Sequence, residues 1–383
     1  MLSAASGPIG PRLASIDRLR GLVMLLMLVD HVREFFFLHQ QVADPMSIAS
    51  TSPQLFFTRF ASHFCAPVFV LLTGLGAWLH GTRAGNGPAG TMRFLLTRGL
   101  VLMALELSVI NFAWSFSLQP PMIYLQVIWA IGLSMVTVAA LIRLPRPLQI
   151  FIALAIMFGH NTLDAVHFTS AEPGFIPWAI LHDRSVIELG AGFSVRTSYP
   201  LLPWIGIMLL GYQLGPLYGA GMDDRRRQRL LCRLGAGCMT LFVLLRLANA
   251  YGDHAWQVGN TVLESLMAFL NVTKYPPSLH FILLTLGVGL PLLALMERLD
   301  PGQILANLGR VPMFFYVSHL YLLHLLQLLL TVCFGPNQGP RFGFSEVWQL
   351  WALAGLVAFL LSRPCRWFGR IKQSRKARWL SYF

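Results

Sequence analysis

Charged residues are scarce in this sequence. Only 12% of its 383 residues are Asp, Glu, Lys or Arg, and 55% are hydrophobic, whereas a soluble domain carries roughly 25% charged residues. Polar stretches long enough to enclose a second, water-soluble core are also lacking. These two shortages argue against an ordinary soluble protein, and they predict a single integral membrane domain over residues 1–383.

Lysine and closely spaced cysteine are rare as well. Of the three lysines, Lys274 is the one outside the C-terminal tail. The five cysteines show no CxxC spacing, so we expect small core residues and predict neither a metal site nor a disulfide framework. No P-loop, GxGxxG, HExxH or GxSxG element stands in a suitable setting, which leaves nucleotide hydrolysis, dinucleotide redox and zinc-protease chemistry without support.

Apolar runs of about 20 residues, each long enough to cross a bilayer of roughly 30 Å, follow one another along the whole chain. They predict an all-α fold, a polytopic transmembrane bundle of about ten helices. The fifth run meets His160, Asn161 and Asp164, so we expect it to be short, broken or partly lining a cavity. The predicted spans are 17–38, 61–81, 93–112, 121–141, 148–166, 200–218, 230–248, 279–297, 311–333 and 344–362.

Basic residues are distributed unevenly between the two sides of such a bundle. If the N-terminus is cytoplasmic, 22 of the 29 Lys and Arg residues fall on the cytoplasmic side. The positive-inside rule therefore predicts that both termini are cytoplasmic, with an N-terminal tail over 1–15 and a basic tail over 364–383. The longest connections, 39–60, 167–199 and 249–278, then all lie on the outer side. We expect the net charge of +13 to face lipid headgroups and not nucleic acid.

The first predicted span carries ionisable residues, which are functional candidates inside a membrane. Arg20 and His31 are eleven positions apart, so both project from nearly the same helix face, about 16 Å apart along the axis. A forked guanidinium suits phosphate, and an imidazole can act as a general base. Asp30 precedes His31, but adjacent side chains diverge on a helix, so their pairing is not guaranteed. Alternatively, Arg20 anchors the topology and His31 forms a hydrogen bond between helices.

The remaining candidates lie near the outer side or in the membrane interior: His63, Asn271, Lys274, Tyr275 and His319. The first lies at the outer end of the second span, where it could face His31. The next three lie in an outer connection with paired prolines, and they could bind a substrate. His319 lies about 12 Å inward from Val311 along the ninth span. The alternative for each is an ordinary hydrogen-bonded structural role.

Several stretches resemble known membrane transferases. The Asp17-x-Leu-Arg20-Gly-Leu segment and the Arg-x10-His element from Arg20 to His31 are similar to the first helix of the membrane acyltransferase-3 families. Longer stretches resemble bacterial membrane proteins grouped with the catalytic domain of heparan-α-glucosaminide N-acetyltransferase. They are His63-Phe-Cys-Ala-Pro67 to Gly74, Tyr199-Pro-Leu-Leu-Pro203-Trp204, Asn271-Val-Thr-Lys274-Tyr275, Gly309-Arg310-Val-Pro312 to Tyr316, and Cys365-Arg366-Trp367.

This resemblance implies acetyl transfer. In that superfamily, acetyl-CoA is presented from the cytoplasmic side, and the acetyl group goes to an acceptor, often a sugar amine or hydroxyl, on the far side. We therefore expect a multi-pass protein of the bacterial inner membrane. Its expected partners are lipid, acyl-CoA and an acceptor for which a saccharide is one candidate; a homo-oligomer stays open. The resemblance implies CoA phosphate binding by Arg20 and a general base at His31. From the positions of the residues we add Asp17 to the CoA site, expect Asp30 or His63 to orient or relay, and expect substrate binding by Asn271, Lys274, Tyr275 and His319.

Two other classes of function stay open. A transporter would use the same intramembrane polar residues as a substrate or proton path, without thioester chemistry. A structural or assembly protein would tolerate replacement of Arg20 and His31. Within the transferase class, the sequence does not choose between direct transfer and a covalent acyl-enzyme.

Overall fold

The computed structural model describes residues 14–37, 46–48, 50–83, 87–190, 192–299, 303–374 and 380. Most of the N-terminal tail expected over 1–15 lies outside these residues. The described chain is built almost entirely from α-helices. They are α1 (Ala14–Phe36), α2 (Pro53–Ser62), α3 (Cys65–Arg83), α4 (Gly87–Leu105), α5 (Asn111–Ser115), α6 (Val127–Leu141), α7 (Arg146–Gly159), α8 (Phe175–Leu181), α9 (Leu202–Gln213), α10 (Asp224–Ala248), α11 (Val262–Leu270), α12 (Leu279–Arg298), α13 (Gln303–Arg310), α14 (Pro312–Phe334) and α15 (Val347–Ser374).

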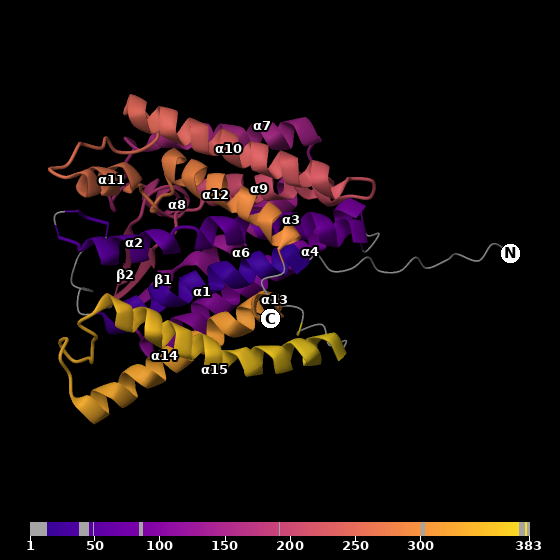
Figure 1. Cartoon of the computed structure of the whole chain (residues 1–383). Coiled ribbons are helices and arrows are strands. Elements are labelled where there is room, and N and C mark those ends of the chain that lie inside the picture. Colours follow the sequence, from indigo (N-terminus) through magenta and orange to yellow (C-terminus); the bar gives the residue numbers. More distant parts are fainter. Residues whose placement is uncertain are drawn as a thin grey trace.

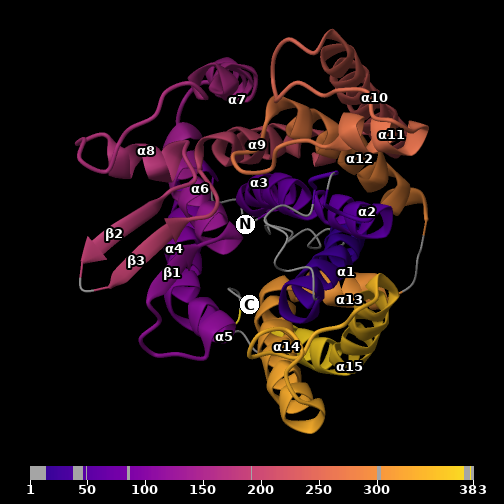
Figure 2. The ribbon, with the colours of Figure 1, turned by 90° about the vertical axis from the view of Figure 1, so that its left-hand side faces the viewer.

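The long helices run side by side as one bundle (Figure 1). Seen along the bundle, α1 and α3 lie near its middle (Figure 2). On one side stand α4 and α6, on another α7, α10 and α12, and on the third α14 and α15. The first predicted span, α1, thus has neighbouring helices on most sides (Figure 2). It is also the most charged of the predicted spans, and a central position keeps its charged side chains away from lipid.

Six helical stretches of the described chain are long and apolar enough to cross a membrane, not the ten that we expected. Each predicted run overlaps a helix, so the all-α polytopic fold is confirmed while the count is not. The helices α6, α7 and α9 have only 15, 14 and 12 residues, and 15 residues span about 22 Å. The charges of α1 set it apart from an ordinary span. The six are Pro53–Thr82, Gly87–Ser115, Asp224–Ala248, Leu279–Arg298, Pro312–Phe334 and Val347–Ser374.

A small three-stranded sheet replaces helix at one predicted boundary. The run 121–141 begins with strand β1 (Met122–Leu125), which pairs in parallel with β3 (Phe193–Thr197). Strand β2 (Val186–Gly190) pairs antiparallel with β3 on its other edge. At the other end of the chain, α15 continues to Ser374, so the first part of the basic tail expected over 364–383 is helical.

The three longest connections gather at one end of the bundle, as the alternating topology predicted. Figure 1 shows α2, α8, α11 and the strands at the left-hand end, while α13 lies toward the opposite end. We call the first end outer and the second inner, following the predicted orientation. One end therefore carries most of the loop surface.

Two glycines bring the inner end together. A Cβ placed on Gly21 of α1 would lie 2.1 Å from the carbonyl oxygen of Leu305, and one placed on Gly309 would lie 1.8 Å from that of Asp17. Neither position could accept a side chain at this helix spacing, and small residues are the usual means of close helix approach in membranes. The contact places Arg310, at the end of α13, beside Asp17.

Candidate functional site

One cavity of about 810 Å³ runs through the middle of the bundle. It is lined from the start of α1, at Asp17 and Arg20, to its last turns, at Asp30 and His31. Arg310 closes the inner end and Lys274 the outer end. Arg20 and His31 thus share the cavity-facing side of α1, as their spacing predicted. The volume is in the upper range for small-molecule sites.

The inner end of the cavity is rich in cationic side chains. Arg20 lies 3.6 Å from Asp17 and donates to the carbonyl oxygen of Leu72. The other oxygen of Asp17 lies 3.8 Å from Arg310, so one carboxylate positions two guanidiniums. Arg98 and Lys372 also line this end. Such an arrangement can receive a phosphate-bearing group.

An aromatic pair lies toward the inner ends of α3 and α4, and apolar side chains contribute much of the remaining lining. The rings of His80 and Phe94 stack at 4.1 Å, and a flat aromatic face of this kind can receive a planar base. The apolar side chains come from α1, α3, α4 and α6. They include Met27, Phe69, Leu79, Leu102, Ile131 and Met135. These side chains offer no hydrogen bonds, so they suit the apolar portions of a ligand.

A pair of histidines, His31 and His319, lies toward the outer end of the cavity. Nδ1 of His31 lies 2.7 Å from Nε2 of His319, and the rings stack with centroids 5.0 Å apart. Nδ1 of His319 lies 2.7 Å from the carbonyl oxygen of Phe315. A carbonyl only accepts, so this nitrogen carries the proton, and the Nε2 lone pair of a neutral His319 accepts from Nδ1 of His31. Because Nδ1 of His31 carries the proton in this series of hydrogen bonds, the basic lone pair of His31 lies on Nε2. The described residues offer that nitrogen no hydrogen bond.

Two aromatic residues hold the ring of His31 from its sides. Trp114 and Tyr316 pack edge-on against it, with centroids 5.3 and 5.7 Å away. Trp114 lies on α5, which follows a π-helical turn over Glu106–Ile110. Such turns are frequent at functional sites. The imidazole is therefore fixed by packing on three helices as well as by its hydrogen bond.

Asp30 is saturated by two arginines. It accepts from Nε of Arg33 at 3.1 Å and, through its other oxygen, from Arg59 of α2. Arg33 also contacts Glu34. Asp30 lines the cavity beside His31, but its hydrogen bonds run to the guanidiniums and not to the imidazole, which agrees with the divergence of adjacent side chains on a helix.

Lys274 reaches the outer end of the cavity from the loop between α11 and α12. Its ammonium lies 5.2 Å from the centre of the Tyr275 ring. The hydroxyl of Tyr275 donates to that of Tyr199 at 3.2 Å, and Tyr199 lines the cavity. These side chains give the outer end a cation and hydroxyls directly above the histidine pair.

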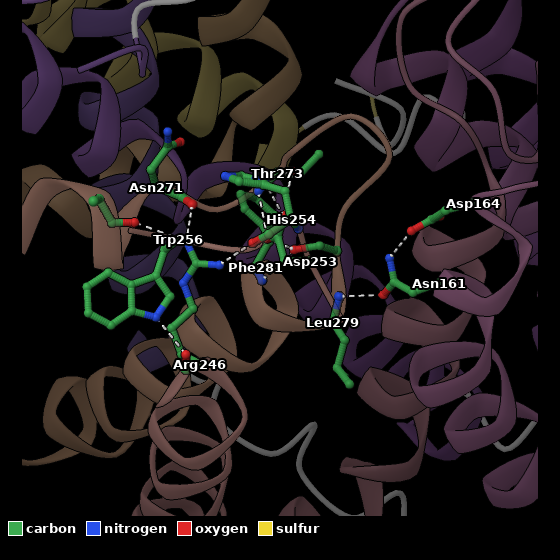
Figure 3. A network of polar contacts seen from close by, with 12 residues as sticks. Asn161, Asp164, Arg246, Asp253, His254, Trp256, Asn271, Thr273, Leu279 and Phe281 are labelled. Carbon is green, nitrogen blue, oxygen red and sulfur yellow. Dashed lines mark hydrogen bonds and ion pairs between the residues drawn. The ribbon is translucent and has the colours of Figure 1, made fainter. Parts of the chain in front are cut away.

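A buried polar network holds this loop in place (Figure 3). Arg246 donates to four backbone carbonyls of residues 254–271, including that of Asn271 at 2.7 Å. Asp253 accepts from the backbone and hydroxyl of Thr273 and from the hydroxyl of Ser278. Burial would raise the pKa of Asp253, but bonds from His254, Ser278 and Thr273 outweigh it and lower that pKa to about 2. Lys274 is thus carried by a rigid segment.

Four predicted site residues are not among the side chains that line the cavity: His63, Asn271, Tyr275 and His319. Tyr275 and His319 contact the lining residues Tyr199 and His31, whereas the other two lie apart. His63 is buried against Phe281 and Phe60, with ring centroids 5.3 and 6.0 Å away, and it does not line the cavity. It therefore does not face His31 as we expected, because its ring turns toward α12. Asn271 contributes its backbone carbonyl to the network around Arg246. Its placement suits a structural role.

Several cavity residues escaped the sequence analysis. Tyr199 and Tyr316 stand inside the quoted stretches that begin at Tyr199 and Gly309, so the signal was present without an assignment. Arg59, which the sequence analysis did not single out, does not line the cavity but binds Asp30, which does. Cys65, which we expected in the core, lines the cavity and donates from Sγ to the carbonyl of Val23 at 3.1 Å. No periodicity points to these residues, since their placement depends on packing between distant helices.

The comparison with known families gives one match. Residues 12–244, more than half of the chain, match the family described as heparan-alpha-glucosaminide N-acetyltransferase, catalytic. No curated protein matches the sequence. The matched segment holds Arg20, His31 and Asp30, while Lys274, which lines the same cavity, and His319, which contacts His31, lie beyond it. The chain is thus a multi-pass membrane protein that belongs to the family of the heparan-alpha-glucosaminide N-acetyltransferase catalytic domain.

Proposed function

We propose that this protein is a membrane-embedded acyltransferase of the bacterial inner membrane, which moves an acetyl group from cytoplasmic acetyl-CoA to an acceptor amine or hydroxyl at or across the membrane. One observation carries the proposal: a single cavity connects a cationic inner end at Arg20 and Arg310 to the histidine pair near the outer end. Acetyl-CoA has an anionic phosphate head and a long thin arm that ends in the thioester, so its two ends match the cationic inner end and the histidine pair.

The inner residues would hold the donor. Arg20 and Arg310, oriented by Asp17, would bind the CoA phosphates through charge-assisted hydrogen bonds. The stacked pair of His80 and Phe94 offers a face for the adenine ring. The pantetheine arm, which alternates methylene groups with two amides, would then follow the cavity past its apolar side chains and present its thioester to His31.

The transfer step uses the histidine pair. Nε2 of His31 would accept the proton of the acceptor amine or hydroxyl as that atom bonds to the thioester carbonyl carbon. The carbon–sulfur bond then breaks, and the CoA thiolate leaves and takes up a proton. His319 is a positioning residue in this scheme, since it holds the tautomer of His31. Asp30 would hold Arg33 and Arg59 in place beside the site, since it binds one with each carboxylate oxygen.

We favour direct transfer because donor and acceptor ends belong to one cavity. A covalent route would require an acyl group on His31 or on the thiol of Cys65, which also lines that cavity. Intact-protein mass spectrometry after mixing with acetyl-CoA, without acceptor, separates the routes. We expect no stable gain of one acetyl group.

Calorimetry of acetyl-CoA binding to detergent-purified protein tests the proposal. We expect Arg20→Ala to weaken binding roughly tenfold to hundredfold, since a hydrogen bond to a charged group contributes about 1.5–3 kcal/mol, and His31→Ala to bind normally. Arg18→Ala is the matched control, because Arg18 instead donates to the carbonyl oxygens of Met296 and Leu299. Absence of binding by folded wild type would favour a transporter.

A further inference from the structure

Lys274 carries its ammonium at a buried position beside the cavity. The residue is only 8% exposed, and its side chain lines the outer end of the cavity. Among the described residues, its ammonium makes no hydrogen bond or ion pair, and the Tyr275 ring 5.2 Å away is its one recorded side-chain contact. A buried unpaired charge is costly, so such a group is expected to meet an anion when the site is filled.

The neighbouring charges cancel without Lys274. Asp30 binds Arg33 and Arg59, one through each carboxylate oxygen. Glu34 contacts Arg33. Among the described residues, two carboxylates thus offset two guanidiniums, and Lys274 adds one further positive charge beside them.

A second cation continues the path to the surface. The guanidinium of Arg184 lies over the ring of Tyr275, 5.0 Å from its centre, and the side chain is exposed. Among the described residues Arg184 has no ion pair. Burial would raise the pKa of Tyr275, but Lys274 and Arg59 lower it to about 8. One ring therefore lies about 5 Å from both an exposed cation and a buried one, in a region of positive potential.

We propose that the outer end of the cavity is an anion subsite, in which Lys274 binds a carboxylate, phosphate or sulfate carried by the acceptor while Arg184 attracts that group from the outer surface. That the anion belongs to the acceptor rests on the proposed function, whereas the existence of an anion site at Lys274 does not. The histidine pair then receives the nucleophile and Lys274 the charge of one molecule, so the site selects acceptors that carry both groups.

Another use of Lys274 predicts a different result. If its ammonium stabilised the oxyanion formed at the thioester carbonyl, its loss would slow every acceptor by the same factor. Under the anion-subsite proposal, its loss slows charged acceptors and spares neutral ones. Matched acceptors that differ only in one anionic group separate the two.

Acetyl transfer to glucosamine and to glucosamine 6-phosphate provides this test. We expect wild type to favour the phosphorylated acceptor in kcat/KM by roughly tenfold to hundredfold, Lys274→Gln to lose the preference, and Lys274→Arg to keep most of it. Arg341→Gln, which removes an exposed outer cation away from the cavity, should behave as wild type. Equal rates for both acceptors in wild type, or an equal loss for both in Lys274→Gln, would overturn the proposal.

A binding measurement separates this inference from the proposed function. Inorganic phosphate is titrated by calorimetry into protein that carries Arg20→Ala, with and without Lys274→Gln, and Lys274→Gln alone is checked for normal acetyl-CoA affinity as proof of folding. Because Arg310, Arg98 and Lys372 stay at the inner end, the comparison is between the two isotherms: a binding component that is lost with Lys274→Gln supports the subsite, and isotherms that are the same with and without Lys274 contradict it. If phosphate binds through Lys274 but wild type does not bind acetyl-CoA, the transferase fails and the anion site stands.

Discussion

Two polar clusters lie close together in the outer half of the molecule, and they differ in how completely their groups are bonded. Around Arg246 and Asp253, nearly every donor and acceptor has a partner: the guanidinium donates four hydrogen bonds, and the carboxylate accepts from Thr273, Ser278 and the His254 backbone. In the cavity, Nε2 of His31 and the ammonium of Lys274 have no hydrogen bond from the described residues. Both clusters are buried, so burial alone does not distinguish them.

The difference teaches where function lies in such a bundle. Buried polar groups are normally hydrogen-bonded. A cluster in which every group has a partner within the protein is therefore accounted for by a structural role, whereas a group that faces a cavity without a partner is expected to bind a ligand. The saturated cluster also serves the open one, because it fixes the loop that carries Lys274 (Figure 3). Mutations in the two clusters should therefore affect different measurements.

The largest expected effect is on the rate, at His31. We expect His31→Gln to lower kcat for acetyl transfer by roughly 10²–10⁴-fold, because general-base catalysis contributes about that much, with acetyl-CoA affinity and thermal stability near wild type. His324→Gln is the control, since His324 stacks on Phe116 and bonds the Ala113 carbonyl. Equal losses in both variants would contradict the contrast between open and saturated groups.

Replacement of Arg246 should act on stability instead. Arg246→Met leaves four buried carbonyls without their donor, and each unsatisfied group costs about 1–3 kcal/mol, so we expect a loss of about 3 kcal/mol or more. Thermal unfolding in detergent measures it. Arg233→Met, an exposed position on the same helix, should change the midpoint little. A normal midpoint for Arg246→Met would show that the saturated cluster is not structural.

His319 sharpens the comparison, since it belongs to the open site but is itself fully bonded. We expect His319→Phe to reduce kcat up to about tenfold, because it removes one hydrogen bond of about 0.5–1.5 kcal/mol that holds the His31 tautomer. His319→Gln offers Nδ1 of His31 a carbonyl acceptor and should restore part of the rate. The pH dependence of kcat should shift in His319→Phe, which a purely structural role would not cause.

The sequence was informative about the bundle and about one helix face, and less so about the site. Apolar length and the bias of basic residues predicted the polytopic fold and the shared side of the long connections. The spacing of Arg20 and His31 placed both on the cavity. The partner of His31 could not be deduced, because 288 positions separate it from His319 and only tertiary packing joins them.

The errors have physical causes too. The expected ten spans assumed that every apolar run crosses the membrane completely. The helix α9 has only 12 residues, and it is apolar because it is buried against neighbouring helices. His63 was expected at the site from its depth alone, whereas the direction of its ring depends on Phe281. The depth of a residue in the membrane can be predicted from its position along a span, but the direction of its side chain depends on how the helices pack.

The smallest expected effect is a pH dependence in the saturated cluster, at Asp253. Its pKa is lowered from the ordinary 3.8 to about 2, so its carboxylate stabilises the fold fully above about pH 4, and this contribution disappears as pH falls from about 4 to about 2. Asp253→Asn should therefore cost at most about 2 kcal/mol near neutral pH, and the difference from wild type should narrow in acid. Thermal midpoints from pH 7 to pH 3 measure it, with the exposed Glu188→Gln as control. A difference that stays constant with pH would mean that the amide fails for reasons of shape, and that charge contributes nothing to this network.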